Sequence, residues 1–227
     1  MTKGKLIVLE GIDGSGKSAQ YRRLCARMEN DGIAYTHIVF PRYDQDSSAL
    51  IRMYLGGAFG QKPGDVNPYA ASTFYAVDRY ASYRTDWGAV YENGGLILSD
   101  RYTTSNAVHQ GSKLPDDELP EFFDWLRDLE YNRMGLPQPD LVIYLDVDVA
   151  TSLARMRRRQ IKTHTHADIH EQDVGYLERC LRTARMAAAH YGWLSIPWLK
   201  DGKERDVDEK NREIYNIIRE HLKERNE

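Results

Sequence analysis

The chain has 227 residues, 41% of them hydrophobic, which is enough for one large α/β domain or two small ones. We predict a single domain over residues 1–227. The 31 Lys and Arg residues against 34 Asp and Glu give a net charge of -3 and a pI of about 6.2. This balance argues against a nucleic acid polymer as partner and favours a small anionic substrate held by local positive clusters.

The sequence has no hydrophobic run as long as a membrane span and no leader-like N-terminus, and its two cysteines, Cys25 and Cys180, lie far apart. We therefore expect a cytoplasmic protein with reduced thiols and no membrane contact.

A glycine-rich segment lies between a hydrophobic stretch at residues 6–9 and a helical pattern that begins near Lys17. It reads Gly11, Ile12, Asp13, Gly14, Ser15, Gly16, Lys17, Ser18. This is the Gly-x-x-x-x-Gly-Lys-Ser pattern of a P-loop, whose backbone N–H groups and following helix dipole bind a polyphosphate. Lys17 is expected to add a mobile positive charge, and the Ser18 hydroxyl to ligate Mg²⁺. The alternative, an ordinary glycine-rich turn, is disfavoured by the strand before it and the helix after it.

The hydrophobic pattern predicts five buried strands separated by helices. The strands are expected at residues 5–10, 33–40, 96–99, 141–145 and 194–199. The helices are expected at residues 17–30, 47–54, 67–91, 115–134, from before Leu153 to Arg159, 170–191 and 207–223. Crossover helices between strands indicate a parallel sheet, so we predict an α/β fold: a three-layer sandwich whose five-stranded parallel sheet is flanked by helices. Ligands of such sheets collect at the carboxyl ends of the strands.

Two segments near that edge are candidates for binding a substrate. The loop Phe40-Pro41-Arg42 follows the second predicted strand and carries a cation, for which the alternative is an exposed loop arginine. Tyr75 and Arg79 are four residues apart in a predicted helix, so they share one face and can point into one cleft. The alternative for Tyr75 is a place in the core.

The third predicted strand ends in Asp100 and Arg101, with Ser105 and Asn106 one helical turn later. An aspartate at the end of a buried strand near a P-loop is a typical second holder of Mg²⁺, and an adjacent arginine can face a phosphate. The alternative is a helix cap followed by a surface ion pair.

An arginine run closes the helix that passes through Leu153 and Met156, and a polar stretch at residues 160–168 follows it. We interpret residues 155–170 as a lid insert that brings positive charge over a phosphate, with Arg155 and Arg159 on one helix face. The alternative is a solvated helix end whose arginines complement the helix dipole.

Taken together, these segments resemble the thymidylate kinases over nearly the whole chain. The resemblance rests on the P-loop with an acid inside it at Asp13, on Phe40-Pro41-Arg42, on Tyr75 with Asp78-Arg79, on Asp100-Arg101-Tyr102 with Ser105-Asn106, and on Leu136-Pro137-x-Pro139-Asp140. It implies a P-loop kinase fold and an enzyme that transfers the γ-phosphoryl group of ATP to dTMP, with Mg²⁺ and a basic lid. A homodimer is expected as well.

The resemblance also implies roles for single residues. Asp13 would face the sugar 3′-hydroxyl, and Arg42 and Arg101 the acceptor phosphate. The base would stack on Tyr75, where many members of the family carry Phe. The remaining assignments are Arg79 and Asn106 at the edge of the base, Ser105 beside them, Arg155 and Arg159 in the lid, and His170 and Glu171 near the sugar. Because the P-loop contains no arginine, the lid must supply the catalytic cation.

Two other functions stay open at this point. A kinase for another nucleotide or nucleoside would keep the P-loop and the lid but change the base pocket. A nucleotide-dependent switch protein would keep the P-loop alone, but the Asn-Lys-x-Asp sequence typical of guanine-specific switches does not occur.

Overall fold

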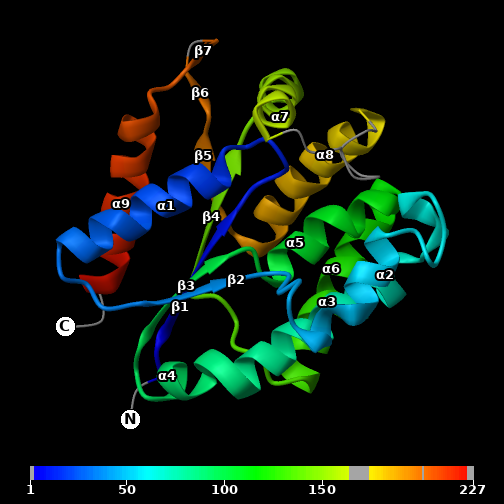
Figure 1. Cartoon of the computed structure of the whole chain (residues 1–227), viewed down its shortest axis with the longest axis horizontal. Coiled ribbons are helices and arrows are strands. Elements are labelled where there is room, and N and C mark those ends of the chain that lie inside the picture. The colour runs from blue at the N-terminus through cyan, green and yellow to red at the C-terminus, as the bar shows by residue number, and fades with distance from the viewer. Residues whose placement is uncertain (1–2, 164–173, 201, 224–227) are drawn as a thin grey trace.

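The computed structural model describes residues 3–163, 174–200 and 202–223, without the side chains of residues 63, 159–163 and 174. Five parallel strands form the central sheet in the order β2-β3-β1-β4-β5 (Figure 1). Their bounds are β1 Lys5–Glu10, β2 Thr36–Val39, β3 Leu96–Asp100, β4 Leu141–Asp146 and β5 Leu194–Pro197. The predicted α/β fold with a five-stranded parallel sheet is confirmed.

Two strands differ from the prediction by more than one residue at an end: β2 begins late, and β5 ends at Pro197 rather than at residue 199. β2 begins at Thr36 rather than at residue 33, because the Ile33 N–H still bonds to the Met28 carbonyl at 2.9 Å and continues the turn that ends α1. After β5 the chain forms a short antiparallel hairpin that the sequence did not predict, made of β6 Leu199–Lys200 and β7 Lys203–Glu204.

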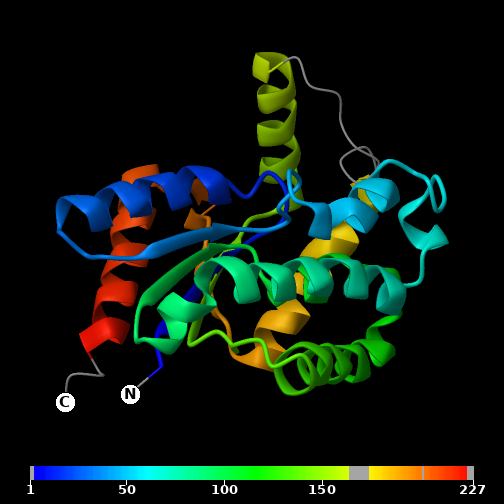
Figure 2. The ribbon, with the colours of Figure 1, turned by 60° about the horizontal axis from the view of Figure 1, so that its bottom comes forward.

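Helices cover both faces of the sheet (Figures 1 and 2). One face carries α1 Lys17–Asn30 and α9 Val207–Lys223, which pack against each other. The other helices are α2 Ala49–Leu55, α3 Pro68–Ser82, α4 Gly88–Glu92, α5 Thr103–His109, α6 Leu119–Arg127, α7 Val149–Thr163 and α8 Val174–Tyr191. A π-helical segment, Tyr83–Trp87, joins α3 to α4 without a break, which confirms the long helix predicted to end near Tyr91.

The prediction that the arginine run ends its helix is wrong. α7 continues to Thr163, because Gln160, Ile161 and Lys162 all sustain a helix. Figure 2 shows α7 rising beside the segment that joins β1 to α1. The rest of the predicted lid, residues 164–170, and the predicted start of the next helix near residue 170 lie outside the described residues, and the described part of that helix is α8, Val174–Tyr191.

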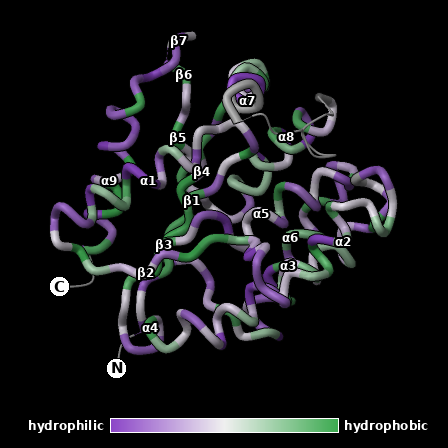
Figure 3. Tube along the Cα trace, viewed as in Figure 1, coloured by the Kyte–Doolittle hydropathy of each residue, from purple (hydrophilic) through white to green (hydrophobic). Residues whose placement is uncertain are grey.

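The three central strands, β1, β3 and β4, are hydrophobic on both faces because helices cover both, and they are green in Figure 3. Leu6 and Val8 of β1 join a buried cluster with Trp87, whereas Ile7 and Leu9 join a cluster that includes α1 and α9. β1 lies between β3 and β4, and the chain crosses to β2 on one side of it and to β4 and β5 on the other. The crevice at the carboxyl end of β1 is therefore where this fold places a ligand.

Candidate active site

The P-loop occupies that crevice and leads directly into α1. Gly14 and Gly16 have φ angles of 75° and 80°, a left-handed conformation that favours glycine, and Gly16 caps the N-terminus of α1. A Cβ atom on Gly14 would lie 2.4 Å from the Ser152 carbonyl oxygen, so this position has no room for a side chain. The loop therefore presents backbone N–H groups and a helix N-terminus to an anion, as predicted.

A cavity of about 940 Å³, which we call the P-loop cavity, opens in front of this loop. Lys17, Ser18 and Asp100 all line it, and the Lys17 ammonium donates to the Asp100 carboxylate across the cavity floor. Burial lowers the pKa of Lys17, and nearby Arg101 lowers it further, against the pull of Asp100. The Ser18 hydroxyl and the Asp100 carboxylate are hard oxygen donors, which suit Mg²⁺ when phosphate oxygens and water complete its shell.

Arg101 stands between the P-loop and α5 in a strained backbone conformation. Its φ is 69°, which is rare for a residue with a side chain. The strain is held by a bond from the Arg101 N–H to the Leu9 carbonyl at 3.3 Å and from the Ser99 hydroxyl to the Arg101 carbonyl at 2.5 Å. The Arg101 guanidinium donates to Asp13 at 2.7 Å and to Ser105 at 3.3 Å. Burial disfavours its charge, but Asp13 and two further carboxylates outweigh this and raise the pKa of Arg101.

Glu10 is a buried acid that the sequence analysis did not select. It is fully buried at the end of β1 and accepts hydrogen bonds from the Gly11 N–H at 2.8 Å, from Thr104 at 2.6 Å and from Ser105 at 2.7 Å. Its carboxylate lies 3.8 Å from Arg101. Glu10 thus ties the start of the P-loop to the start of α5.

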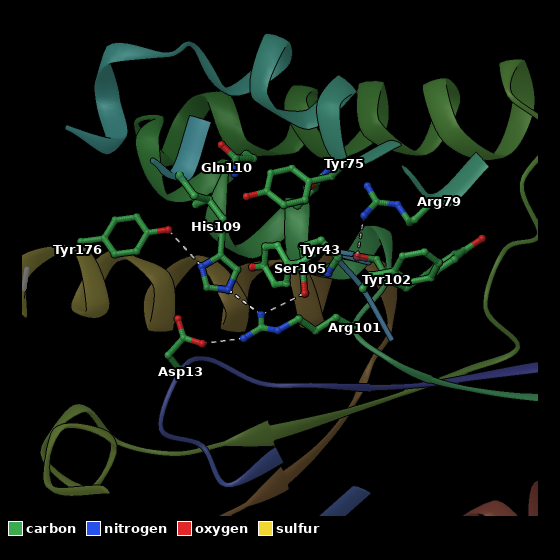
Figure 4. A pocket seen from close by; sticks show the side chains of 14 residues that line it. Asp13, Tyr43, Tyr75, Arg79, Arg101, Tyr102, Ser105, His109, Gln110 and Tyr176 are labelled. Atoms are coloured by element: carbon green, nitrogen blue, oxygen red, sulfur yellow. Dashed lines mark hydrogen bonds and ion pairs between the residues drawn. The ribbon is translucent and has the colours of Figure 1, made fainter. Parts of the chain in front are cut away.

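A second cavity, of about 670 Å³, lies on the far side of Arg101 (Figure 4). We call it the aromatic cavity because four tyrosines contribute to its wall. The lining residues are Asp13, Phe40, Pro41, Tyr43, Leu55, Tyr75, Arg79, Arg101, Tyr102, Ser105, Asn106, His109, Gln110 and Tyr176.

Arg79 and Asn106 reach this cavity, each held by a partner. Glu130 accepts from Nε and Nη2 of Arg79 at 2.6 Å each, and it also accepts from Thr103 at 2.6 Å. This buried pair fixes the plane of the guanidinium, and although burial opposes it, Glu130 raises the pKa of Arg79. The Asn106 amide nitrogen donates to the Ser72 carbonyl at 3.1 Å, which orients its amide oxygen as an acceptor toward other groups.

The structure does not bring Arg42 to either cavity, contrary to the prediction. Its guanidinium pairs with Asp78, which is almost fully buried, and with Asp86, and it donates to Ser47 at 3.0 Å. These acceptors satisfy Arg42 away from the site. The next residue, Tyr43, lies in the turn closed by the bond from the Gln45 N–H to the Arg42 carbonyl at 2.9 Å, and it lines the aromatic cavity instead.

The lid arginines are placed only in part. Arg155 lines the P-loop cavity, donates to the Ser15 carbonyl at 3.2 Å, pairs with Glu204 of β7 and lies 4.4 Å over the ring of Trp198. Arg159 is in α7, but its side chain is outside the described part of the chain, and so are His170 and Glu171. Arg158 is exposed.

The structure adds residues that sequence reasoning missed. His109 is one turn beyond Ser105 on α5, so helical spacing could have indicated it. Gln110 follows it directly. Tyr176 comes from α8, and no local signal in the sequence relates it to the site.

The two cavities meet, since Asp13, Phe40 and Arg101 line both of them. A phosphate-binding loop beside a second cavity lined by aromatic and polar side chains is the arrangement of P-loop kinases that phosphorylate small molecules. Comparison with known proteins narrows this class: the family model described as thymidylate kinase matches residues 9–191. The chain belongs to the thymidylate kinase family.

Individual relatives agree with this. The chain is 31% identical over 196 residues to the thymidylate kinase of Mycobacterium tuberculosis, covering 84% of this chain and 90% of that protein. It is 33% identical over 165 residues to a probable thymidylate kinase of Thermococcus gammatolerans, covering 70% and 74%. The solved thymidylate kinase of Candida albicans superposes with a TM-score of 0.69 over 97% of this chain and 93% of that one, at 19% identity, which shows the shared fold. Among the described residues, no helix combines the length and hydrophobicity that a membrane crossing requires.

Proposed function

We propose that the protein transfers the γ-phosphoryl group of ATP to dTMP, giving ADP and dTDP. The observation that carries this proposal is that Asp13, Phe40 and Arg101 line both cavities. A polyphosphate on the P-loop and a monophosphate nucleotide in the aromatic cavity would therefore present their phosphates to each other at Arg101. Such positioning supplies most of the catalysis in phosphoryl transfer.

The P-loop cavity suits the donor. Backbone N–H groups of residues 11–18 and the N-terminus of α1 bind the phosphates of ATP, and Lys17 leaves Asp100 to contact the terminal phosphates. Ser18 and Asp100 would hold Mg²⁺, which neutralises phosphate charge when bound. Asp100 would then pair with Mg²⁺ in place of the Lys17 ammonium, so its carboxylate would still face a positive charge.

The aromatic cavity suits thymine. Tyr75 offers a ring for stacking, and the fixed guanidinium of Arg79 offers donors to the base oxygen O4. The Asn106 amide oxygen, left as an acceptor by the bond to Ser72, matches the donor at N3–H. Cytosine carries a donor at the first of these places and an acceptor at the second, so the same residues would reject it.

The chemical step needs no side chain as a base. An oxygen of the dTMP phosphate is already an anion; it bonds to the γ-phosphorus while the bond from that phosphorus to the β–γ bridging oxygen breaks, and ADP leaves with the electron pair. Arg101 neutralises the acceptor phosphate, and Asp13 orients Arg101 and the sugar. We propose that Arg155 and Arg159, in a lid over residues 155–170, cover the group in transfer, with His170 and Glu171 near the sugar.

A panel of nucleoside monophosphates tests this assignment. With ATP and Mg²⁺, diphosphate formation should be fastest with dTMP. The kcat/KM for dCMP should be lower by roughly 100-fold or more, because two reversed polar contacts each cost about 1–3 kcal/mol in a buried site. A higher kcat/KM for dCMP or dGMP than for dTMP would contradict the base assignment and favour a kinase for another nucleotide.

We further propose a cytoplasmic homodimer that pairs through α2 and α3. Four hydrophobic side chains on these neighbouring helices are 41–49% exposed: Leu50 and Met53 on α2, and Val77 and Tyr80 on α3. Their spacing of three residues places each pair on one helix face. The molar mass in light scattering should be twice that of the chain, and Val77→Glu should shift it to the monomer, whereas Val90→Glu on α4 should not. A monomeric wild type would end this proposal.

A further inference from the structure

His109 touches Arg101, the residue at which the two cavities meet. The His109 Nε2 atom lies 2.9 Å from Arg101 Nη1, the same nitrogen that donates to Ser105 at 3.3 Å. On its other edge Arg101 donates to Asp13 at 2.7 Å (Figure 4). The guanidinium is therefore held from both sides, by the P-loop on one and by α5 on the other.

The contact determines the protonation state of His109. A guanidinium has only donors, so Nε2 must accept, and the neutral ring carries its hydrogen on Nδ1. Nδ1 lies 3.1 Å from the Tyr176 hydroxyl and 3.7 Å from the Cys180 sulfur, both on α8. The Tyr176 oxygen accepts this hydrogen, so α8 selects the tautomer that can serve Arg101.

In the described part of the chain, His109 contacts Arg101 on one edge of its ring and Tyr176 and Cys180 on the other. Arg101 is positive, and Asp13 lies beyond it, already paired with it. Burial raises the pKa of the Cys180 thiol to about 12 and keeps the pKa of Tyr176 well above its usual value, so both are neutral near pH 7.

We propose that His109 is a positioning residue for Arg101: as the Nδ1–H tautomer selected by Tyr176, it holds the guanidinium toward the acceptor phosphate. The inference rests on the proposed function, which assigns that phosphate to Arg101. Uptake of a proton at Nε2 removes the acceptor and puts two positive charges side by side, so Arg101 is released in acid. Protonation of His109 therefore weakens binding of the acceptor nucleotide.

Two substitutions separate the hydrogen bond from the packing of the ring. His109→Gln keeps an acceptor and cannot take up a proton, whereas His109→Phe keeps a ring and offers no acceptor. The KM for dTMP should rise about 10-fold in His109→Phe, the loss of one bond to a charged donor, and less than about threefold in His109→Gln. The KM for ATP should change in neither. Equal KM values for dTMP in the two variants would overturn the proposal.

The pH dependence gives a second readout that simple packing would not move. Between about pH 8 and pH 6 the KM for dTMP should rise in the wild type, partly because the substrate phosphate itself takes up a proton near pH 6. His109→Gln should retain only this substrate contribution and show the shallower profile. Profiles that superimpose would refute a role for the His109 proton.

A direct measurement covers the case in which His109→Phe does not fold. In ¹⁵N NMR of the wild type, with the His109 signals assigned by their loss in His109→Gln, Nδ1 should carry the hydrogen and Nε2 should not. The opposite tautomer would overturn the proposal. Arg101→Lys tests the proposed function separately: an unchanged KM for dTMP would remove Arg101 from the phosphate site, yet the tautomer result would stand on its own.

Discussion

Glu130→Gln is expected to damage both the stability of the fold and the binding of the base. The substitution removes the counter-charge of Arg79 and replaces an acceptor that serves two donors by an amide nitrogen. Both side chains are at most 2% exposed, so solvent cannot take over. Breaking a buried ion pair by removing one partner costs about 3–5 kcal/mol, and the amide keeps one acceptor, so we expect about 3 kcal/mol.

That loss corresponds to a fall in Tm of about 6–12 °C for a chain of this size, measurable by calorimetry or circular dichroism. The KM for dTMP should rise about 10-fold, because the guanidinium is no longer fixed toward the base, while the KM for ATP stays constant. The double variant Arg79→Met/Glu130→Met removes both charges, so it should recover at least half of the lost stability but not the affinity for dTMP.

Two results would refute this reasoning. One is a loss of stability in Glu130→Gln below about 1 kcal/mol, which would mean that the pair is not desolvated as the structure indicates. The other is a double variant as unstable as the single one, which would mean that the packing of these side chains, and not their charge, is what the fold requires.

Three further predictions concern charged groups. Lys17→Ala should lower kcat roughly 10²–10³-fold in a protein that is still folded by circular dichroism, whereas Lys62→Ala on the surface should leave kcat unchanged; equal kcat values would exclude the P-loop role. Arg155→Ala and Arg159→Ala should lower kcat far more than Arg158→Ala, with nucleotide binding near normal in titration calorimetry. Small and equal effects in all three variants would mean that these arginines are only a solvated part of the helix surface. Burial lowers the pKa of Lys113 to about 8, so between about pH 8 and 10.5 the folded state binds fewer protons than the unfolded state, and the contribution of Lys113 to stability rises with pH. The free energy of unfolding, measured with denaturant, should therefore rise less with pH in Lys113→Met than in the wild type. The same slope in both proteins would contradict this prediction.

The parts of the fold that local patterns encode were predicted well. β1, β3 and β4 are short hydrophobic runs, and the P-loop is recognised by glycines at positions that need a positive φ. Tyr75, Arg79, Ser105 and Asn106 all line one cavity, and the spacing of four residues between Tyr75 and Arg79 had indicated a shared helix face; the binding roles of all four stay predictions.

What the sequence could not give depends on packing between distant elements. Glu130 lies in a π-helical segment, Asp128–Arg133, that follows α6, and it pairs with Arg79 of α3 across 51 positions of sequence; a buried acid in a helical pattern carries no sign of such a partner. Arg42 was misplaced for a related reason: a loop cation near the sheet edge has no local signal that Asp78 will bind it. The length of α7 was missed because a run of arginines resembles a helix end.

The stacking of Arg155 on Trp198 makes the fluorescence of this tryptophan sensitive to the position of Arg155. The indole is 1% exposed, carries Arg155 on its ring and has Lys210 Nζ 3.3 Å from its centre. Positive charges so close to an indole shift and quench its emission, and Arg155 belongs to the lid helix. If Arg155 leaves Glu204 for a phosphate, as proposed, the wavelength and intensity of the Trp198 emission should change. With Trp87, Trp125 and Trp193 replaced by Phe, the remaining emission would follow the movement of the lid in real time, without an added dye.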